Sequence, residues 1–109
     1  MSFQNQFTKT TTDANLMETV HHGSAEYPFR YYYENIALFD FKCIDWHWHS
    51  ELEFIYIESG NVVFDIGTVH FELNEGNGIM INSKILHRLQ SSSDAIIPNF
   101  LFQPSFIAP

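Results

Sequence analysis

The sequence is poor in basic residues, in cysteine and in long apolar runs. Its 109 residues include only five Lys and Arg against thirteen Asp and Glu, a formal net charge of -8. DNA affinity rests on Lys and Arg that neutralise phosphates, so this balance argues against nucleic-acid binding by this segment. The single cysteine, Cys43, has no partner for an internal disulfide, which agrees with a reducing compartment.

Membrane and secretion signals are also missing. No apolar run has the length of a bilayer span, and residues 1–26 lack the apolar stretch of a signal peptide. We therefore expect a cytoplasmic protein without a membrane partner. Hydrophobic residues nevertheless make up 45% of the chain and aromatic residues 17%, which excludes disorder for its body and suits one domain with one core.

Short apolar segments separated by turn residues predict an all-β domain over residues 27–109, after a flexible polar arm over residues 1–26. No convincing amphipathic helix interrupts them, which indicates a sandwich or barrel. We expect strands at 27–33, 36–44, 52–57, 62–66, 69–73, 79–81, 87–90 and 95–102.

Three of these strands carry more detailed expectations. The strand at 52–57 is apolar on both faces, which predicts packing on two sides. Pro98 interrupts the last strand, which indicates an edge or a bulge that could serve for dimer pairing. The tyrosine-rich strand at 27–33 begins near Pro28, as an edge strand does, and its rings serve either for packing or for stacking on a sugar.

The stretch Trp-His-Trp-His-Ser-Glu-Leu-Glu at residues 46–53 is the most informative in the chain. In an extended strand His47 and His49 share one face, and the two tryptophans share the other. A tight bend after His49 would bring the Glu53 carboxylate back beside the imidazoles. His87 is a fourth candidate later in the chain. Imidazoles and carboxylates are ligands of divalent transition metals, so the sequence predicts a cluster of four metal-ligating groups.

This spacing resembles the first motif of the cupin superfamily, which four residues match: His47, His49, Glu53 and Gly60. The second cupin motif is only half kept. Gly76 and His87 hold their places, but its Pro, Gly and Asn positions carry Asn82, Lys84 and Ser91. Cupin resemblance implies a double-stranded β-helix, the jelly-roll barrel.

Within the cupins, the amino-acid sequence is most similar to the N-terminal sensor domain of AraC-family transcription regulators, over roughly residues 27–107. That resemblance implies a homodimer whose arm can fold over a pocket for a small-molecule effector, possibly a sugar. It also implies that DNA is contacted only by a C-terminal helix-turn-helix domain, which would follow Pro109. On this interpretation the chain is a fragment that senses the effector.

Two alternatives stay open. The cluster of His47, His49, Glu53 and His87 either holds a metal, with Zn, Ni, Mn or Fe admissible, or forms a metal-free network lining a polar pocket. The chain is either a sensor without catalytic residues or a free-standing metal-dependent enzyme, such as a dioxygenase or sugar isomerase. The apolar walls of the pocket would come partly from four residues of neighbouring strands: Phe54, Tyr56, Phe64 and Ile81.

Four further side chains are expected to lie outside the pocket. Trp46 and Trp48 face away from the histidines and would serve packing or a partner surface. His70 points away from the core by the alternation of its strand. Glu51 lies at the bend and is expected to be solvated, since acids are rarely buried without a partner.

Overall fold

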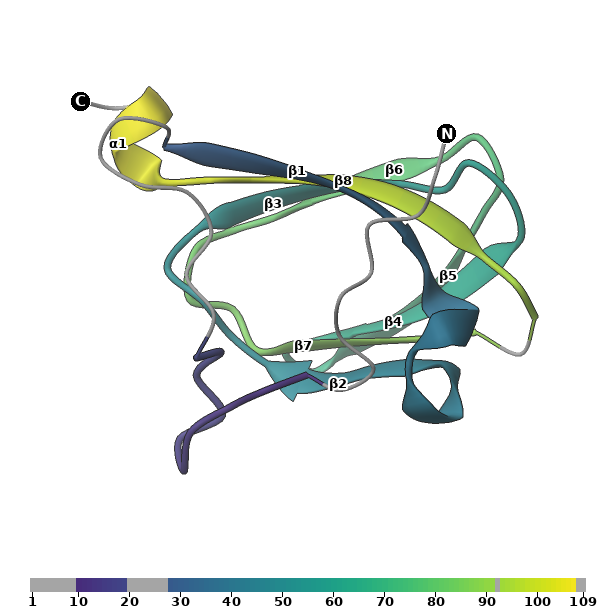
Figure 1. Cartoon of the computed structure of the whole chain (residues 1–109), viewed down its shortest axis with the longest axis horizontal. Helices are drawn as coiled ribbons and strands as arrows, with labels where there is room; N and C mark the ends of the chain where they lie inside the picture. Colours follow the sequence, from purple (N-terminus) through teal and green to yellow (C-terminus); the bar gives the residue numbers. More distant parts are fainter. Residues whose placement is uncertain (1–9, 20–27, 92, 108–109) are drawn as a thin grey trace.

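The structure is a computed structural model that describes residues 10–19, 28–91 and 93–107. The predicted boundary between residues 26 and 27 lies outside the described residues, as does part of the predicted arm. The described strands form two antiparallel sheets, ordered β1-β8-β3-β6 and β2-β7-β4-β5 (Figure 1). The elements are β1 (Phe29–Asn35), η1 (Ile36–Leu38), η2 (Asp40–Lys42), β2 (Cys43–His47), β3 (Leu52–Tyr56), β4 (Asn61–Ile66), β5 (Val69–Asn74), β6 (Gly78–Ile81), β7 (His87–Gln90), β8 (Ile96–Phe102) and α1 (Pro104–Ile107).

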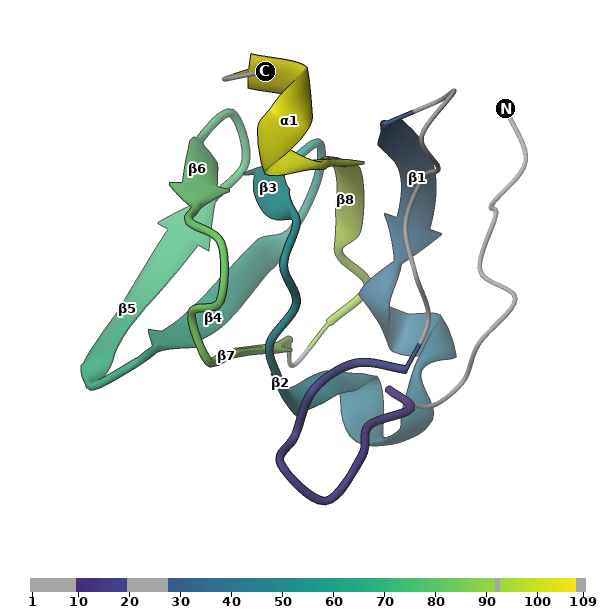
Figure 2. The same ribbon diagram turned by 90° about the vertical axis from the view of Figure 1, so that its left-hand side faces the viewer.

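The two sheets face each other as layers (Figures 1 and 2). Buried side chains from both sheets form the hydrophobic core. Ile55 on β3 and Phe64 on β4 are fully buried, one from each sheet. Burying a side chain of this size stabilises the fold by about 1.5–3 kcal/mol. This arrangement confirms the predicted all-β jelly-roll fold.

β3 alternates between a buried and an exposed face. Glu53 and Ile55 point inward, whereas Phe54 and Tyr56 are 38% and 40% exposed. The prediction that this strand is packed on two sides is therefore wrong. Apolar character on both faces does not identify a covered strand here, because the outer face of this sheet is itself apolar, with Met80 and Phe100 beside Phe54.

The predicted strand at 36–44 is also wrong, because this stretch contains two 3-10 helices. β1 belongs to one sheet and β2 to the other, so the chain must cross between layers here. The Asn35 side chain caps η1 by accepting a hydrogen bond from the Ala37 amide. Phe41 and Lys42 then take left-handed φ values of 60° and 51°, which turn the chain into β2.

β8 is an interior strand, which corrects the expectation of an edge at 95–102. It pairs with β1 along its whole length and with β3 over its second half. Pro98 lies opposite Tyr33 of β1, just before the register with β3 begins at Asn99. A residue without an amide hydrogen is tolerated there because only one neighbouring strand is in register. β8 is therefore not available for dimer pairing.

The free edges of the described sheets belong to other strands. β1 and β6 end one sheet, and β2 and β5 end the other. The expectation of an edge strand at the tyrosine-rich segment is thus confirmed by β1. The described part of the chain contains no helix with the length and apolar character needed to cross a bilayer.

Candidate functional site

Four buried side chains meet where β2 turns into β3. His47 ends β2, His49 follows two positions later, Glu53 is the second residue of β3, and His87 begins β7. His47 lies opposite His87 in the antiparallel pairing of β2 with β7, and their ring centroids are 4.1 Å apart. One ligand atom from each of the four residues lies within 4.8 Å of the others. The structure thus brings together the four residues that the spacing placed in one cluster.

The three histidines are oriented by the backbone. Each Nδ1–H can donate to a carbonyl oxygen two residues away, which leaves Nε2 to face the cluster. The three contacts are His47 to Asp45 at 2.7 Å, His49 to Glu51 at 2.9 Å and His87 to Ile85 at 2.7 Å. The Nε2 atoms of His49 and His87 each lie 3.2 Å from Oε1 of Glu53.

Without a metal, the contacts of His49 suit a charged imidazole. A ring that donates from Nδ1 to a carbonyl and from Nε2 to Glu53 is an imidazolium. Burial lowers the pKa of His49, but the hydrogen bond and charge of Glu53 outweigh burial and raise that pKa to about 9. Burial likewise raises the pKa of Glu53, and hydrogen bonds from His49 and His87 reverse this and hold it well below its ordinary value. His47 differs, because burial and repulsion from His87 lower its pKa to about 4.

A divalent transition metal fits the same donor set. It would accept three Nε2 lone pairs and a carboxylate oxygen, so that neither His49 nor His87 would need a second proton. Histidines that bind metals commonly donate their other ring nitrogen to a backbone carbonyl or carboxylate, as all three do here. The cluster of His47, His49, Glu53 and His87 could therefore hold a metal ion.

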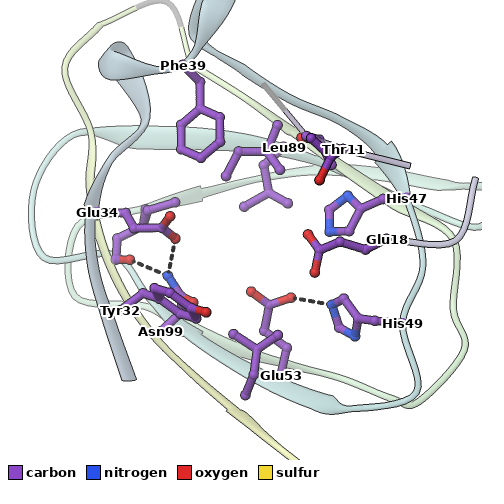
Figure 3. A pocket seen from close by; sticks show the side chains of 14 residues that line it. Thr11, Glu18, Tyr32, Glu34, Phe39, His47, His49, Glu53, Leu89 and Asn99 are labelled. Carbon is purple, nitrogen blue, oxygen red and sulfur yellow. Dashed lines mark hydrogen bonds and ion pairs between the residues drawn. The ribbon is translucent and has the colours of Figure 1, made fainter. Parts of the chain in front are cut away.

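A pocket opens between the two sheets beside this cluster (Figure 3). It offers about 60 Å³ to the centres of water-sized molecules, which is room for roughly four to six waters. His47, His49 and Glu53 line it, whereas His87 is fully buried behind them. Its other lining residues are Thr10, Thr11, Glu18, Tyr32, Glu34, Phe39, Ile44, Leu89, Ile97, Asn99 and Leu101.

Sequence reasoning did not single out five polar lining residues: Thr10, Thr11, Glu18, Glu34 and Asn99. Tyr32 belongs to the tyrosine-rich strand whose rings were expected to pack or to stack on a sugar. Tyr32 and Glu34 point inward from β1, and Asn99 points inward from β8 (Figure 3). The Asn99 amide donates to Oε1 of Glu34 at 2.8 Å and to the Ile97 carbonyl at 2.9 Å. Alternation along β1 could have placed Tyr32 and Glu34 on one face. Glu18 belongs to the predicted arm, which the family resemblance implied could fold over the pocket, and Glu18 is among the lining residues.

None of the four residues expected in the apolar pocket wall lines this pocket. Phe54 and Tyr56 are 38% and 40% exposed on the outer face of their sheet. Phe64 and Ile81 are buried in the core, where the Phe64 ring stacks on Phe71 with centroids 5.6 Å apart. The expectation for the apolar wall is therefore wrong.

Three of the four expectations for surrounding side chains are confirmed. Trp46 and Trp48 lie outside the pocket lining, and the Arg88 guanidinium sits 4.9 Å from the Trp46 ring centroid. The His70 side chain is 69% exposed and bonds Asp65 through Nδ1. Glu51 is only 6% exposed, so its predicted solvation is wrong. The turn that carries the Glu51 carbonyl to His49 also buries the Glu51 side chain.

Residues 10–19 lie against the end of β2 and reach the pocket (Figure 2). Trp48 holds this segment in three ways: its indole donates to the Asn15 carbonyl, its amide to the Leu16 carbonyl, and its own carbonyl accepts from the Glu18 amide. Through this anchor Glu18 joins the pocket lining. The Thr10 hydroxyl, also in the lining, is buried without a hydrogen-bond partner among the described residues.

Solved structures with a similar fold include a cupin-domain protein. A cupin-2 domain protein from Shewanella frigidimarina matches with a TM-score of 0.61 and 13% identity, over 70% of this chain and 72% of that one. A predicted oxalate decarboxylase from Thermotoga maritima matches with a TM-score of 0.53 and 20% identity, over 56% of each chain. These likenesses show a cupin-type fold.

The sequence narrows the class further. Residues 39–107 match the model of the AraC-like ligand binding domain, and the chain belongs to this family. The uncharacterised HTH-type transcriptional regulator YdeC of Bacillus subtilis is 37% identical over 75 residues, which is 69% of this chain. The chain spans 26% of the length of that relative. The predicted membership of the AraC-type ligand binding domains is thus confirmed.

Proposed function

We propose that this domain senses a small organic effector for a transcription regulator that acts in the cytoplasm. The observation that carries the proposal is the pocket between the sheets, lined by polar groups from β1, β8 and the histidine cluster. Ligand pockets typically combine apolar walls with a few convergent polar groups, as this one does. DNA would be contacted by another domain, since the chain itself is strongly acidic.

The effector would act on the segment at residues 10–19. With Thr10, Thr11 and Glu18 in the lining, the pocket has room for only a few non-hydrogen atoms, so a sugar would have to displace this segment. A ligand shifts such an equilibrium only by its difference in affinity for the two arrangements, typically worth about 1–3 kcal/mol. Displacement would change the surface offered to a second copy of the chain or to the DNA-binding domain.

Binding can be tested by screening small sugars, amines and acids for stabilisation. A ligand at about 100 times its dissociation constant adds about 2.7 kcal/mol to the free energy of unfolding. We expect Asn99→Ala to abolish the stabilisation produced by a binding compound and Tyr56→Ala, outside the pocket, to preserve it. Equal responses in both variants would place the binding site elsewhere.

We also propose that His47, His49, Glu53 and His87 hold one divalent transition metal. The fixed Nδ1 contacts support this, because they present three Nε2 lone pairs to one carboxylate. When bound, the metal would supply a Lewis-acidic position at the pocket wall. Elemental analysis of untagged protein should find about one Zn, Ni, Mn or Fe per chain.

The matched variants for the metal are His87→Gln and His70→Gln. His87 belongs to the cluster but not to the pocket lining, so its loss should lower metal affinity at least about tenfold, as lost ligand contacts do. His70 lies exposed outside the cluster, and its replacement should leave the metal content unchanged. Metal-free wild-type protein would contradict the proposal.

A further inference from the structure

The sheet β1-β8-β3-β6, the upper layer in Figure 1, has an apolar outer face. One row of side chains crosses all four strands in register, from Tyr31 through Phe100 and Phe54 to Met80. Side chains alternate along a strand, so every charged residue of these four described strands falls on an inward position. The outward positions hold apolar and aromatic residues, with one neutral amide at Asn35.

The other sheet shows the opposite pattern. On its outer face Asp65 of β4 lies opposite His70 of β5 and Arg88 of β7. The Arg88 guanidinium pairs with Asp65 at 3.0 Å. Antiparallel sheets normally carry polar groups on a face that water covers, as this sheet does. The apolar outer face is therefore peculiar to one sheet, and contiguous apolar surface of this kind marks an interaction site.

The central side chains of the apolar face are already held in place. The rings of Tyr31 and Phe100 lie against each other, with centroids 4.7 Å apart. Phe54 packs over Gly78, where a Cβ atom would come within 3.0 Å of Cζ of the ring. Side chains that are fixed before binding lose less entropy when a partner covers them.

The area of the apolar face suits an interface. Phe29, Phe54, Tyr56, Met80 and Phe100 are each between 38% and 50% exposed. At roughly 200 Å² for a fully exposed side chain of this size, they expose about 400 Å². Half-buried neighbours raise this area to about 500–600 Å², so two such faces would bury about 1,000–1,200 Å². That total reaches the lower end of the range for specific protein interfaces, about 1,200 Å².

Charge favours a second copy of the chain as the partner. Each copy carries a net charge of -8, so two copies repel each other through any face that brings their carboxylates together. The apolar face lets them meet with their acidic groups directed away from the contact. Binding at a lipid surface normally uses Lys and Arg beside the apolar side chains. The outward positions of these described strands hold neither.

We propose that two copies of this chain form a homodimer through the outer faces of their β1-β8-β3-β6 sheets. A two-fold axis along the strands sets Met80 of one protomer over the partner's Tyr31, which brings sulfur and aromatic ring into contact. The same axis sets Phe54 over the partner's Phe100. β8 contributes side chains to this contact and not backbone, so its interior position in the sheet is no obstacle. The dimer requires neither the pocket nor the metal.

Sedimentation equilibrium of the chain between about 1 and 200 μM tests the proposal, and we expect a dimer to predominate above about 100 μM, as a small interface allows. Met80 gives a second measurement that needs no substitution. With hydrogen peroxide in excess, its oxidation should be several-fold slower at about 200 μM than at about 1 μM protein, because the partner covers it. Met17, on the segment at residues 10–19, is the internal control and should oxidise at the same rate at both concentrations.

Met80→Glu and Val69→Glu are matched variants. Both replace an exposed apolar side chain on an edge strand, Met80 on β6 at 50% and Val69 on β5 at 58% exposure. Both add the same charge, but only Met80 lies on the apolar face. Met80→Glu should raise the dissociation constant of the dimer at least about tenfold, because it puts two carboxylates into the contact. Val69→Glu should change that constant less than about twofold, and circular dichroism checks that both variants are folded.

A monomer at every concentration, with Met80 oxidised at a constant rate, would overturn the proposal. If that monomer co-sediments with vesicles of neutral phosphatidylcholine, the apolar face binds lipid instead. Equal weakening by Met80→Glu and Val69→Glu would attribute the effect to net charge. A dimer that neither variant weakens would place the interface elsewhere on the molecule.

Discussion

Glu53 is the side chain on which the buried cluster depends. Its Oε1 atom accepts from His49 and His87, each at 3.2 Å, and it is only 8% exposed. A buried carboxylate is costly unless it is paired, and either the imidazoles of His49 and His87 or one metal supplies that pairing. In the metal-free protein, this pairing must make the free energy of unfolding depend on pH, because the pKa of His49 differs between the folded and unfolded states.

Metal-free protein should lose stability between about pH 6.5 and pH 9. The pKa of His49 is raised in the folded state from 6.5 to about 9, because Glu53 outweighs the effect of burial. The resulting stabilisation is complete below pH 6.5 and is lost as the pH rises through 9, with a loss of order 2–3 kcal/mol. Urea unfolding in EDTA across this range measures it. Glu53→Gln should flatten the slope, whereas an equally steep slope in that variant would contradict this origin.

Residue identities in the cluster could be predicted from the sequence because a strand places alternate residues on one face. His47 and His49 follow that rule, and Glu53 returns on the adjacent strand. Sequence reasoning failed where tertiary context decides the environment. Glu51 is buried because of the turn geometry. Tyr56 faces outward, although its aromatic ring was expected in the apolar wall of the pocket.

At the scale of elements, the anchoring of residues 10–19 by Trp48 connects the N-terminal segment with the pocket. The indole N–H of Trp48 donates to the Asn15 carbonyl at 2.9 Å. The Trp48 backbone pairs with Leu16 and Glu18 on the same segment. Trp48 therefore contacts the N-terminal segment and lines neither the pocket nor the core.

Trp48→Phe should loosen this segment without unfolding the barrel. The variant keeps an aromatic ring but loses the hydrogen bond to Asn15, worth about 0.5–1.5 kcal/mol. Hydrogen exchange measured by mass spectrometry should become several-fold faster at residues 10–19 and stay unchanged in β8. Trp46→Phe is the control, because Trp46 contacts Arg88 rather than the segment. Unchanged exchange in Trp48→Phe would show that other contacts hold the segment.

Strand positions were largely predictable, but their neighbours in the sheets were not. The segments at 62–66, 69–73, 79–81 and 87–90 all lie in strands, since local alternation and turn residues set them. The crossing at 36–44 could not be predicted from the local sequence. The chain crosses there because β1 and β2 belong to different sheets. The interior position of β8 likewise depends on register with β3, which allows Pro98 to lie beyond the shared pairing.

For the whole molecule, the cupin motifs predict the barrel but leave the pocket's chemistry undefined. The motif residues come from β2, β3 and β7, whereas the Glu34 and Asn99 end comes from β1 and β8. No local pattern connects strands so distant in sequence. The Glu34 and Asn99 end of the pocket is therefore a property of the sheet order, and the end with His47, His49 and Glu53 a property of the motif.

The acidic balance of the chain predicts its behaviour toward DNA. Of the basic side chains described, Arg88 is already paired with Asp65 at 3.0 Å, and Arg30, Lys42 and Lys84 come from separate elements or loops. With a net charge of -8, the chain should repel a duplex rather than release its counterions.

We expect no mobility shift of duplex DNA at about 50 mM salt with protein up to about 100 μM, where non-specific binders usually associate. A basic DNA-binding domain of similar size is the positive control. Micromolar binding that weakens steeply with added salt would show that this domain contacts phosphates itself, and DNA binding would then not require another domain.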